Sequence, residues 1–520
     1  MRFMAPEKLP DLGGRLTRVA TPTRAVVVGG GLAGVSAALS LAERGVTTTL
    51  LEAGGVLGGR VSAWDDQLAT GERFQMGRGF HAFFRQYYNL RNLLKRLDPE
   101  LHMLTPMTDY PVHGRGGAVQ TFVGIPNQPP FNLIELTRRT PYLKLRDLLR
   151  VNVREALAMV AYDGATTYAR YDHLSARDYL DSLRFPPQAR AMLFNVFAHS
   201  FFNAEEEMSA AELLMMFHFY FTGSGEGLVF DVLNQPFSTG LWQPLARELA
   251  ALRVDVRTHA EVLRVSPRGA GYVVECAGEQ LETDQLVLAL SVPALKALVE
   301  RSPELSHAGF RRSVQSLETT RPFVVWRRWI DRRARAERHG FVGTNELGHI
   351  DNISLFERFE DQSHDWAERH GGSVVEIHAY AVEPDFEESA LRDELWQATL
   401  ALYPEFAGAR VFDERWLVRE DCPAFAPGSH AQRPTPNTPL RGLTLAGDFV
   451  KLPMPSALME RATAAGMLAA NHLLAERDVI GSPVFSVPRR GLLALGHLPS
   501  WPSRGAAMNP AREPLPGVNP

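Results

Sequence analysis

A glycine-rich turn near the start of the chain constrains the fold more than any other feature of the sequence. Residues 24–28 (RAVVV) are mostly β-branched, which is typical of a strand buried inside a parallel sheet. Residues 32–44 are rich in good helix formers and predict a helix. The turn between them reads GGGLAG and matches the spacing G-x-G-x-x-G at Gly29, Gly31 and Gly34.

This arrangement of strand, turn and helix is typical of a dinucleotide site. We expect Gly29 to allow the tight turn, Gly31 to let the backbone approach a pyrophosphate, and Gly34 to permit close contact between helix and strand. Leu32 and Ala33 lie at the start of the helix, where free N–H groups and positive potential attract phosphates. The alternative is that these glycines only form a turn.

An acidic residue after a second strand strengthens the dinucleotide interpretation. Glu52 follows a predicted strand (TTTLL) and lies 18 positions after the last glycine of the turn, where it can bind ribose hydroxyls. The next segment carries Gly58, Gly59 and Arg60 and resembles the E-x-x-x-x-x-G-G-R extension of FAD-binding oxidoreductases related to the amine oxidases. This resemblance favours FAD over NAD, with Arg60 meeting the pyrophosphate or a flavin carbonyl.

A later segment repeats the pattern expected of the same lobe. Residues 241–252 predict a helix, residues 254–256 and 261–263 predict strands, and residues 284–293 predict a strand and turn that lead into a second lobe. In the resembled family, the residue equivalent to Val262 contacts the adenine through its backbone. The alternative for Val262 is an ordinary strand position.

A third segment near the end of the chain resembles the motif that closes the flavin site in the same family. Gly447 and Asp448 end the sequence LAGD, and a helix is predicted from about Ser456 to Leu474. The resemblance implies that Asp448 holds the ribityl or pyrophosphate region and that Met459 lies near the flavin. N–H groups at the helix start would then stabilise the anionic reduced flavin. The alternative for this motif is an ordinary turn at the end of a strand.

Residues 77–90 make the resemblance more specific. This segment (GRGFHAFFRQYYNL) is similar to the G-x-H-x-F-F-x-x-Y-x-N motif of plant-type phytoene and ζ-carotene desaturases. Residues 76–92, 109–111 and 201–231 are more similar still to the carotene desaturase/methyltransferases, the isorenieratene synthase-like ring synthases that aromatise a β-ring. The similarity covers residues from about 24 to 474.

The resemblance implies a carotenoid substrate and names a quinone as a candidate electron acceptor. The sequence departs from the family motif at one position that bears on both the substrate and the quinone. Arg461 stands where plant-type desaturases carry glycine in the sequence M-E-G-A. A bulky arginine beside the flavin would change the quinone and substrate geometry of those enzymes.

The implied chemistry places the difficult step on the flavin. FAD takes a hydride beside the ring carbon that carries two methyl groups, a 1,2-methyl shift relieves the cation, and a proton then leaves. No external methyl donor is needed, and the glycine run at residues 223–227 follows an aromatic segment rather than the strand that an S-adenosylmethionine site requires. Methyl migration is implied by the resemblance and by no single residue.

Three polar residues are candidates for handling the proton or the cation. His81 can accept a proton near neutral pH, although it could equally satisfy a backbone carbonyl. Glu226 and Asp231 lie beside an aromatic run and could stabilise a cation, with a solvated or turn carboxylate as the alternative. The acidic residues 205–207 predict an exposed charge cluster or a helix start.

Residues 194–230 are rich in aromatic side chains suited to lining a polyene tunnel, since ring faces stabilise cations. Core packing is the alternative for each ring. The apolar run at residues 213–221 is too short to span a bilayer and predicts core or a lipid-facing entrance. The aromatic residues are Phe197, Phe201, Phe202, Phe217, Phe219, Tyr220 and Phe221.

Composition excludes other classes. Of the 520 residues, 45% are hydrophobic, so the chain can bury a large core divided into two or more lobes. The 55 basic and 59 acidic residues lack the positive excess that nucleic-acid binding needs. Two cysteines, Cys276 and Cys422, form neither a disulfide framework nor a metal-binding spacing. Residues 1–23 lack a secretory apolar stretch, so we expect a metal-free cytoplasmic protein. Because the resemblance implies a carotenoid substrate, which resides in the membrane, we also expect the protein to meet the membrane peripherally.

These observations predict an α/β fold, with a glutathione-reductase-like FAD-binding Rossmann domain and an interleaved α+β substrate domain. The FAD-binding domain is expected to comprise residues 24–99, 236–295 and 416–476, and the substrate domain residues 100–235 and 296–415. Residues 1–23 and 483–520 are expected to be flexible tails.

The expected function is that of an FAD-dependent carotenoid desaturase/methyltransferase. One alternative is an ordinary carotenoid desaturase, or an amine- or porphyrinogen-oxidising relative, which a compact aromatic cage rather than a long tunnel would indicate. Another is a non-catalytic prenyl-lipid carrier, which would need a degraded flavin site. Because the glycines, Glu52, Arg60 and Asp448 are all present, the sequence favours retained FAD.

Overall fold

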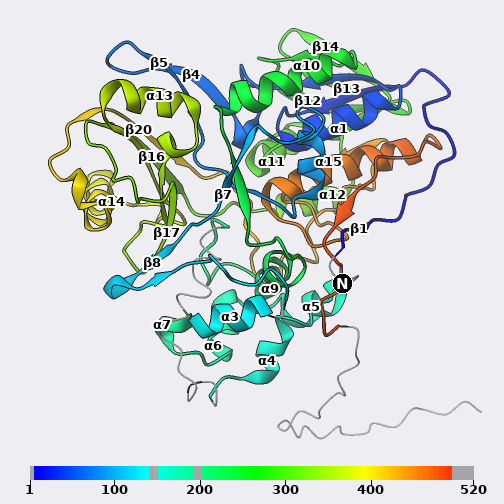
Figure 1. Ribbon diagram of the computed structural model, residues 1–520. Coiled ribbons are helices and arrows are strands. Elements are labelled where there is room, and N and C mark those ends of the chain that lie inside the picture. Colours follow the sequence, from blue (N-terminus) through cyan, green and yellow to red (C-terminus); the bar gives the residue numbers. More distant parts are fainter. Residues whose placement is uncertain (1–4, 130, 140–146, 148–149, 191–200, 495–520) are drawn as a thin grey trace, which may run out of the picture.

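The computed structural model describes residues 5–129, 131–139, 147, 150–190 and 201–494. Figure 1 shows three regions: an α/β lobe at the upper right, a second sheet-based lobe at the upper left, and a helical region below them.

A five-stranded parallel sheet forms the centre of the α/β lobe. Its strands are β2 (Arg24–Val28), β3 (Thr47–Leu51), β11 (Asp255–Arg257), β15 (Gln285–Leu288) and β21 (Leu443–Leu445), in the order β11-β3-β2-β15-β21. Val27 pairs with Leu50 on one side and Val287 on the other, and all three side chains are fully buried. Such apolar strands suit a sheet covered on both faces. All five strands lie within the three segments predicted for FAD binding.

Two helices pack closely beside the glycine turn. Helix α1 (Leu32–Glu43) begins directly after Gly31, and α15 (Leu458–Ala475) returns from near the end of the chain. A Cβ added to Gly466 would lie 2.0 Å from the Ala33 carbonyl oxygen, so the two helices approach at backbone distance. The first residues of both helices line the same cavity.

The remainder of this lobe is an antiparallel sheet and three helices. The sheet consists of β12 (Val262–Arg268), β13 (Gly271–Cys276) and β14 (Glu279–Thr283). The helices are α10 (Gln243–Ala251), α11 (Val292–Arg301) and α12 (Ala308–Gln315). The helix predicted at residues 241–252 starts earlier in the structure, because a π-helical turn at Ser238–Trp242 leads into α10.

The second lobe is built on a seven-stranded mixed sheet. In spatial order its strands are β20 (Val411–Arg419), β16 (Phe323–Ile330), β19 (Ser373–Ala379), β18 (Asn352–Leu355), β17 (Phe341–Asn345), β8 (Val112–Gly114) and β9 (Val119–Gln120). Only β17 and β8 pair in parallel. Helices α13 (Asp361–His370) and α14 (Glu388–Leu402) belong to this lobe (Figure 1). Every residue of β19 is buried, so its polar side chains need partners inside the protein.

Two smaller sheets join the parts of the molecule. Strands β4 (Ala63–Gln67) and β5 (Arg73–Gly77) form a hairpin. Strand β10 (Phe230–Leu233) lies between β6 (Phe83–Phe84) and β7 (Leu104–Met107). The pairing of β10 with β6 links residues on the two sides of the domain boundary predicted near residue 99.

Short helices make up the lower region. They are α3 (Phe131–Arg139), α4 (Val153–Ala158), α5 (Gly164–Tyr171), α6 (Ala176–Ser182), α7 (Pro187–Arg190) and α9 (Ala210–Phe217), and α2 (Tyr88–Leu94) packs against α15. Most of the apolar run at residues 213–221 is core. Helix α9 passes into a π-helical turn at His218–Thr222, and all side chains of the run except Phe217 are buried. Among the described residues, none of the helices is both long and apolar enough to cross a bilayer.

The predicted tails need correction where they meet the α/β lobe. Strand β1 (Glu7–Lys8) pairs with β22 (Phe485–Ser486), although both lie in segments expected to be flexible. The Asn89 side chain bonds to the backbone N–H and carbonyl of Phe485, and the Leu9 amide donates to the Val484 carbonyl. Composition missed this pairing because the two strands are short and far apart in the sequence.

Candidate functional site

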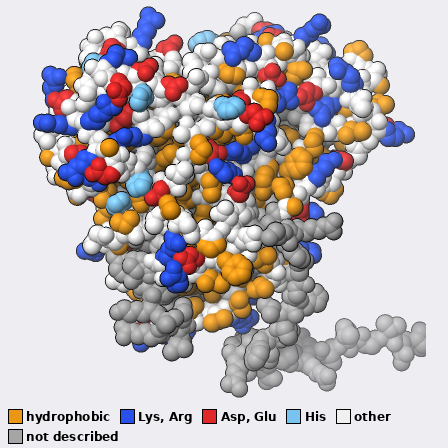
Figure 2. Space-filling model, in the orientation of Figure 1, with side chains coloured by type: hydrophobic (Ala, Val, Ile, Leu, Met, Phe, Trp, Pro, Cys, Tyr) orange, Lys and Arg blue, Asp and Glu red, His pale blue; other side chains and the backbone are white. Residues whose placement is uncertain are grey.

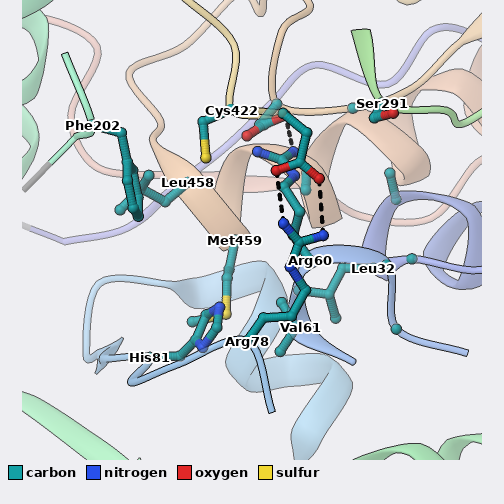
Figure 3. Close-up of a pocket in the computed structure, with 18 of the residues that line it drawn as sticks. Leu32, Arg60, Val61, Arg78, His81, Phe202, Ser291, Cys422, Leu458 and Met459 are labelled. Atoms are coloured by element: carbon teal, nitrogen blue, oxygen red, sulfur yellow. Dashed lines mark hydrogen bonds and ion pairs between the residues drawn. The ribbon is translucent and has the colours of Figure 1, made fainter. Parts of the chain in front are cut away.

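A cavity of about 590 Å³ runs between the α/β lobe and the second lobe. One end is lined by the glycine turn and the start of α1, and the other by side chains of the seven-stranded sheet. Figure 3 shows the middle of this cavity, where Arg60, His81 and Met459 lie on its wall.

The three motif glycines have different surroundings. Gly29 has a φ of +108°, and a Cβ there would lie 2.3 Å from the Ala289 carbonyl oxygen. A Cβ on Gly34 would lie 1.8 Å from the Gly29 carbonyl oxygen, so this glycine allows the helix to touch the strand. A Cβ on Gly31 would meet nothing closer than 3.8 Å, so its missing side chain leaves open space on the cavity wall. The surroundings of Gly29 and Gly34 match the tight turn and the close helix–strand contact expected from the sequence, and the open space at Gly31 leaves room for the expected pyrophosphate.

Glu52 lies at the nucleotide end of the cavity. It follows β3, and its two carboxylate oxygens accept hydrogen bonds of 2.7 Å from the backbone N–H groups of Gly30 and Gly54. These bonds fix the carboxylate beside the glycine turn, where ribose hydroxyls would be bound. Val262 is buried and lines the same end, at the start of β12.

Gly58 and Gly59 pack against the glycine turn at residues 29–34. The Gly58 amide donates to the Gly30 carbonyl at 2.9 Å, and both Gly58 and Gly59 have positive φ values, +128° and +55°. Arg60 follows them and forms an ion pair with Asp448, so the segments predicted to hold the cofactor meet at this pair. Figure 3 shows Arg60 on the cavity wall beside Leu32 and Val61.

The end of the site formed by α15 is open to a ligand. Gly447 has a φ of +149°, and Asp448 behind it is buried. Met459 lies in the first turn of α15, and no side chain caps the N-terminus of this helix. The N-terminus of α1 is uncapped as well. Two helix ends with free N–H groups therefore border one cavity, which suits a ligand that carries phosphates at one end and carbonyl oxygens at the other.

The sequence predicted a bulky arginine beside the flavin. This prediction is corrected, because the Arg461 side chain does not project into the cavity. It is buried, donates a 2.8 Å hydrogen bond to the Ser456 carbonyl, and forms an ion pair with Glu212. Glu212 also binds the Tyr168 hydroxyl at 2.5 Å and Arg433 at 3.3 Å. These contacts hold the Arg461 side chain away from the cavity.

His81 lies on the cavity wall and also satisfies a backbone carbonyl. Its Nδ1 is 2.8 Å from the Gly79 carbonyl oxygen, so Nδ1 donates and Nε2 keeps a free lone pair. Burial lowers the pKa of His81 to about 4, which leaves the ring neutral and a weak base at neutral pH.

Glu226 and Asp231 do not line the cavity, and the prediction that they act on the substrate is corrected. Glu226 is exposed and lies 3.6 Å from Arg85. Asp231 is buried on β10, where its carboxylate pairs with Arg91 at 2.6 Å. Each carboxylate is thus paired with an arginine outside the cavity.

The acidic cluster at residues 205–207 is also different from the prediction. It forms a turn, and Glu205 is buried in an ion pair with Arg190 at 2.7 Å. Glu206 and Glu207 pair with Arg177 and Arg321.

The aromatic residues predicted to line a tunnel divide into two groups. Phe201, Phe202 and Tyr220 line the cavity, whereas Phe217, Phe219 and Phe221 pack in the core. Phe197 lies outside the described residues. Phe230, the last residue of the predicted aromatic stretch, also lines the cavity. The sequence did not assign the remaining rings to the wall, which are Phe80, Phe84, Tyr87, Tyr110, Phe122, Phe323, Phe341 and Tyr380.

Sequence reasoning also missed a polar network at the far end of the cavity. His378 and Tyr380 line the cavity, and Glu376 lies behind them. His378 Nδ1 is 2.6 Å from the Tyr380 hydroxyl, and His378 Nε2 is 2.8 Å from a Glu376 oxygen. The signal was the alternation E-x-H-x-Y in an otherwise apolar strand, which places three polar side chains on one face.

The residues of the cavity fit FAD. The open space at Gly31 and the uncapped α1 suit a pyrophosphate, Glu52 suits a ribose, and the uncapped α15 suits the flavin carbonyls. Within the described part of the chain, no group of three or more His, Cys, Asp and Glu side chains could hold a metal ion. Cys276 and Cys422 are both free thiols.

Comparisons with known proteins agree with this site. The family model described as flavin containing amine oxidoreductase matches residues 32–474. The carotenoid phi-ring synthase of Streptomyces griseus is 45% identical over 488 residues, which cover 94% of each chain. The carotenoid phi-ring synthase of Chlorobaculum tepidum is 28% identical and covers 92% of each chain. The zeta-carotene desaturase of Synechocystis is 24% identical over 89% of this chain and 99% of its own.

Solved structures show the same fold at lower sequence identity. Putrescine oxidase bound to putrescine superposes with a TM-score of 0.63 and 17% identity, covering 88% of this chain and 99% of its own. Cyclohexylamine oxidase from Brevibacterium oxydans has a TM-score of 0.62 and 15% identity over the same shares. The predicted fold class, the predicted FAD and the resemblance to carotenoid ring synthases are therefore confirmed. The chain belongs to the flavin containing amine oxidoreductase family, and it is an FAD-dependent oxidoreductase.

Proposed function

We propose that this protein is an FAD-dependent carotenoid desaturase/methyltransferase that converts a β-ring end group into an aromatic ring. The observation that carries the proposal is the 45% identity, over 94% of each chain, to a protein named carotenoid phi-ring synthase. The cavity supports it, because the FAD-binding end continues into a chamber walled by aromatic rings.

The aromatic chamber suits the chemistry of this reaction. FAD supplies the acceptor for the hydride that leaves the ring. Phe80, Phe230 and Phe341 pack edge-to-face or stacked on one another, with ring centroids 4.5–6.0 Å apart, and so form one continuous wall. This wall excludes water from a substrate cation, and its ring faces stabilise the positive charge.

The methyl group stays within the substrate in this proposal. Each ring loses four hydrogens, as two hydrides that FAD accepts in two successive oxidations and two protons. A cation beside the carbon that carries two methyl groups is relieved by a 1,2-shift, and loss of the last proton completes the aromatic ring. The glycine run at residues 223–227 supports this view, because it follows a π-helical turn rather than a strand. A Cβ on Gly227 would lie 2.0 Å from the Tyr220 carbonyl oxygen, so this glycine is a packed part of the cavity wall.

Expression in a bacterial host that accumulates β-carotene tests the proposed function. The expected product is a new pigment that lacks four hydrogens per modified ring and retains every carbon, detected by chromatography and mass spectrometry. Unchanged β-carotene in cells whose purified protein carries FAD would contradict the proposal. Acyclic carotenes would then be tested, because the zeta-carotene desaturase of Synechocystis is also a relative.

We further propose that the protein lies in the cytoplasm and docks on the membrane through the α3 patch, defined as Val123, Phe131 and Ile134. These side chains are 51%, 59% and 59% exposed. Neighbouring apolar side chains that are exposed to this degree are typical of a surface that binds a membrane or another protein. The Arg139 side chain joins them, because it donates from the end of α3 to the Val123 carbonyl. Figure 2 shows hydrophobic side chains gathered over this lower region.

The position of the patch supports delivery of a lipid-soluble substrate. Phe122 precedes Val123 in the chain, lines the cavity, and stacks on Tyr110 with ring centroids 4.7 Å apart. A carotenoid that leaves the bilayer at the patch would thus meet the cavity wall directly.

Because the patch would face the bilayer, we also propose that a membrane quinone reoxidises FAD. A soluble quinone analogue added to the anaerobic enzyme would test this proposal.

A further inference from the structure

We propose that the Tyr380 hydroxyl accepts the proton released from the substrate ring and passes its own proton to His378, which Glu376 supports from behind. This inference rests on the proposed function, since it concerns the proton that must leave when the ring becomes aromatic.

The register of three strands builds this relay. Glu376 and His378 lie on one face of β19, and Tyr380 follows one residue after the strand ends. Glu376 is directly opposite Arg327 on β16, and His378 is opposite Asn352 on β18. The first pairing gives Glu376 an ion-pair partner, and the second brings the Asn352 amide beside the relay, where it donates to the Tyr380 hydroxyl.

The hydrogen bonds of the relay run in one direction. Glu376 is a carboxylate that accepts from Arg327 at 2.7 and 2.8 Å, and its other oxygen lies 2.8 Å from His378 Nε2. Nε2 therefore carries the hydrogen, and Nδ1 is left to accept from the Tyr380 hydroxyl at 2.6 Å. The Phe80 amide also approaches Nε2, but at 3.4 Å it competes poorly with the carboxylate.

A negatively charged carboxylate lies behind His378. Burial raises the pKa of Glu376, but Arg327 and His378 outweigh this effect and hold the pKa at about 2, so the carboxylate keeps its negative charge. A protonated His378 would lie directly against that charge. Burial raises the pKa of the Tyr380 phenol, and the 3.0 Å hydrogen bond from the Asn352 amide opposes this by stabilising negative charge on the oxygen.

The proton transfer balances within this set of residues. The ring C–H bond breaks, its electron pair remains on the ring as part of the new double bond, and the proton bonds to Tyr380 Oη. The original phenol proton moves to His378 Nδ1. The positive charge of the substrate cation thus becomes an imidazolium beside Glu376, and the phenol is unchanged after the step.

Several other polar groups on the cavity wall are held by different partners. Asp448 and Asp421 are paired with Arg60 and Arg78, and two backbone N–H groups hold Glu52. The hydroxyls of Tyr87 and Tyr220 bind one another at 2.7 Å. His81 donates through Nδ1 to a carbonyl and is a weak base.

Two variants of the FAD-bound enzyme test the relay, with a third as a matched control. Tyr380→Phe removes only the hydroxyl, and His378→Gln removes the base. Both are expected to keep FAD and to hold KM within about 3-fold, while kcat falls by about 10²-fold or more, the usual contribution of a proton acceptor. Tyr272→Phe removes a buried hydroxyl bound to the Arg441 carbonyl, outside the cavity, and is expected to keep kcat. Wild-type kcat in Tyr380→Phe would overturn the proposal.

A measurement without substrate separates this inference from the proposed function. In protein labelled with ¹⁵N-histidine, the His378 signal is identified by its absence from His378→Gln. An unprotonated Nδ1, whose shift changes in Tyr380→Phe, would support the relay, and a protonated Nδ1 would overturn it. If the wild-type protein leaves β-carotene unchanged, the proposed function fails, and the histidine signal still decides for or against the relay.

Discussion

At the scale of single residues, the glycine turn shows that two glycines of one motif can be required for different reasons. Gly34 has no room for a side chain, because the Gly29 carbonyl oxygen occupies the place of its Cβ. Gly31 has room, because its Cβ would point into the cavity. We therefore infer that Gly34 is needed for folding and Gly31 for cofactor binding.

Alanine at these two positions should separate the two roles. We expect Gly34→Ala to lower the free energy of unfolding by about 1–3 kcal/mol or more, as overpacking does. Gly31→Ala should melt close to the wild-type apoprotein but bind FAD at least about 10-fold more weakly, since a methyl group would occupy the pyrophosphate position. Thermal melts of the apoproteins and FAD titrations measure both effects. A Gly34→Ala protein as stable as wild type would contradict the predicted clash.

Glu460 is a second residue whose environment has a measurable consequence. Its carboxyl is fully enclosed next to the start of α2, where it accepts from the Asn89 and Leu90 backbone N–H groups at 3.0 and 2.9 Å. Burial raises its pKa to about 7 from an ordinary value of 4.5, although these hydrogen bonds oppose the shift. The folded protein therefore holds this proton more tightly than the unfolded chain does.

The stability of the wild type should accordingly fall as pH rises from about 4.5 to 7. This contribution is largest below pH 4.5 and is lost as the pH passes the folded pKa, with a total of up to about 3 kcal/mol. Glu460→Gln cannot titrate, so its free energy of unfolding should lack that decline. Urea unfolding of both proteins at several pH values tests this, and parallel pH profiles would count against a raised pKa.

At the scale of elements, α3 and its neighbouring loop should determine membrane attachment. Replacing Phe131 and Ile134 by Ser removes two exposed apolar side chains, each of which can contribute about 1.5–3 kcal/mol when buried in lipid. We expect binding to anionic phospholipid vesicles to fall by at least about 10-fold, measured by sedimentation.

A matched control uses two exposed apolar residues of the α/β lobe. Leu263 and Ile480 are each 39% exposed, and their replacement by Ser should leave vesicle binding unchanged. An equal loss in both double variants would show that general surface hydrophobicity, rather than the α3 patch, governs binding.

At the scale of the whole molecule, the cavity joins the two lobes. Its lining includes the glycine turn of one lobe and strands β16 to β19 of the other, so we expect bound FAD to contact a surface that both lobes form. At about 100 times its dissociation constant, FAD should raise the free energy of unfolding by about 2.7 kcal/mol.

Fluorescence can follow this effect, because Trp242 lies in the α/β lobe and Trp329 in the second lobe. The emission lost in Trp242→Phe reports on the α/β lobe. The second lobe contributes several tryptophans, namely Trp326, Trp329, Trp366, Trp396 and Trp416. We expect one transition that moves upward as a unit when FAD is added. Two transitions, of which only that of the α/β lobe moves, would show that FAD does not couple the lobes.

The sequence by itself determined the nucleotide end of the site. Strand, glycine turn, helix and acid follow one another within about thirty residues, so their local spacing already specifies their geometry. Gly29, Gly31, Gly34 and Glu52 therefore lie where the pattern predicts. The same holds for β2, β3 and α1, whose apolar or helix-forming runs are continuous in the chain.

Only the tertiary structure decided which polar side chains reach the substrate end. Asp231 and Arg461 meet Arg91 and Glu212, partners separated from them by 140 and 249 positions. Tyr380 acquires its relay because strand register places β19 between β16 and β18. Local propensity specifies that a strand forms, but register and burial determine which side chain lies opposite, and these depend on contacts between distant segments.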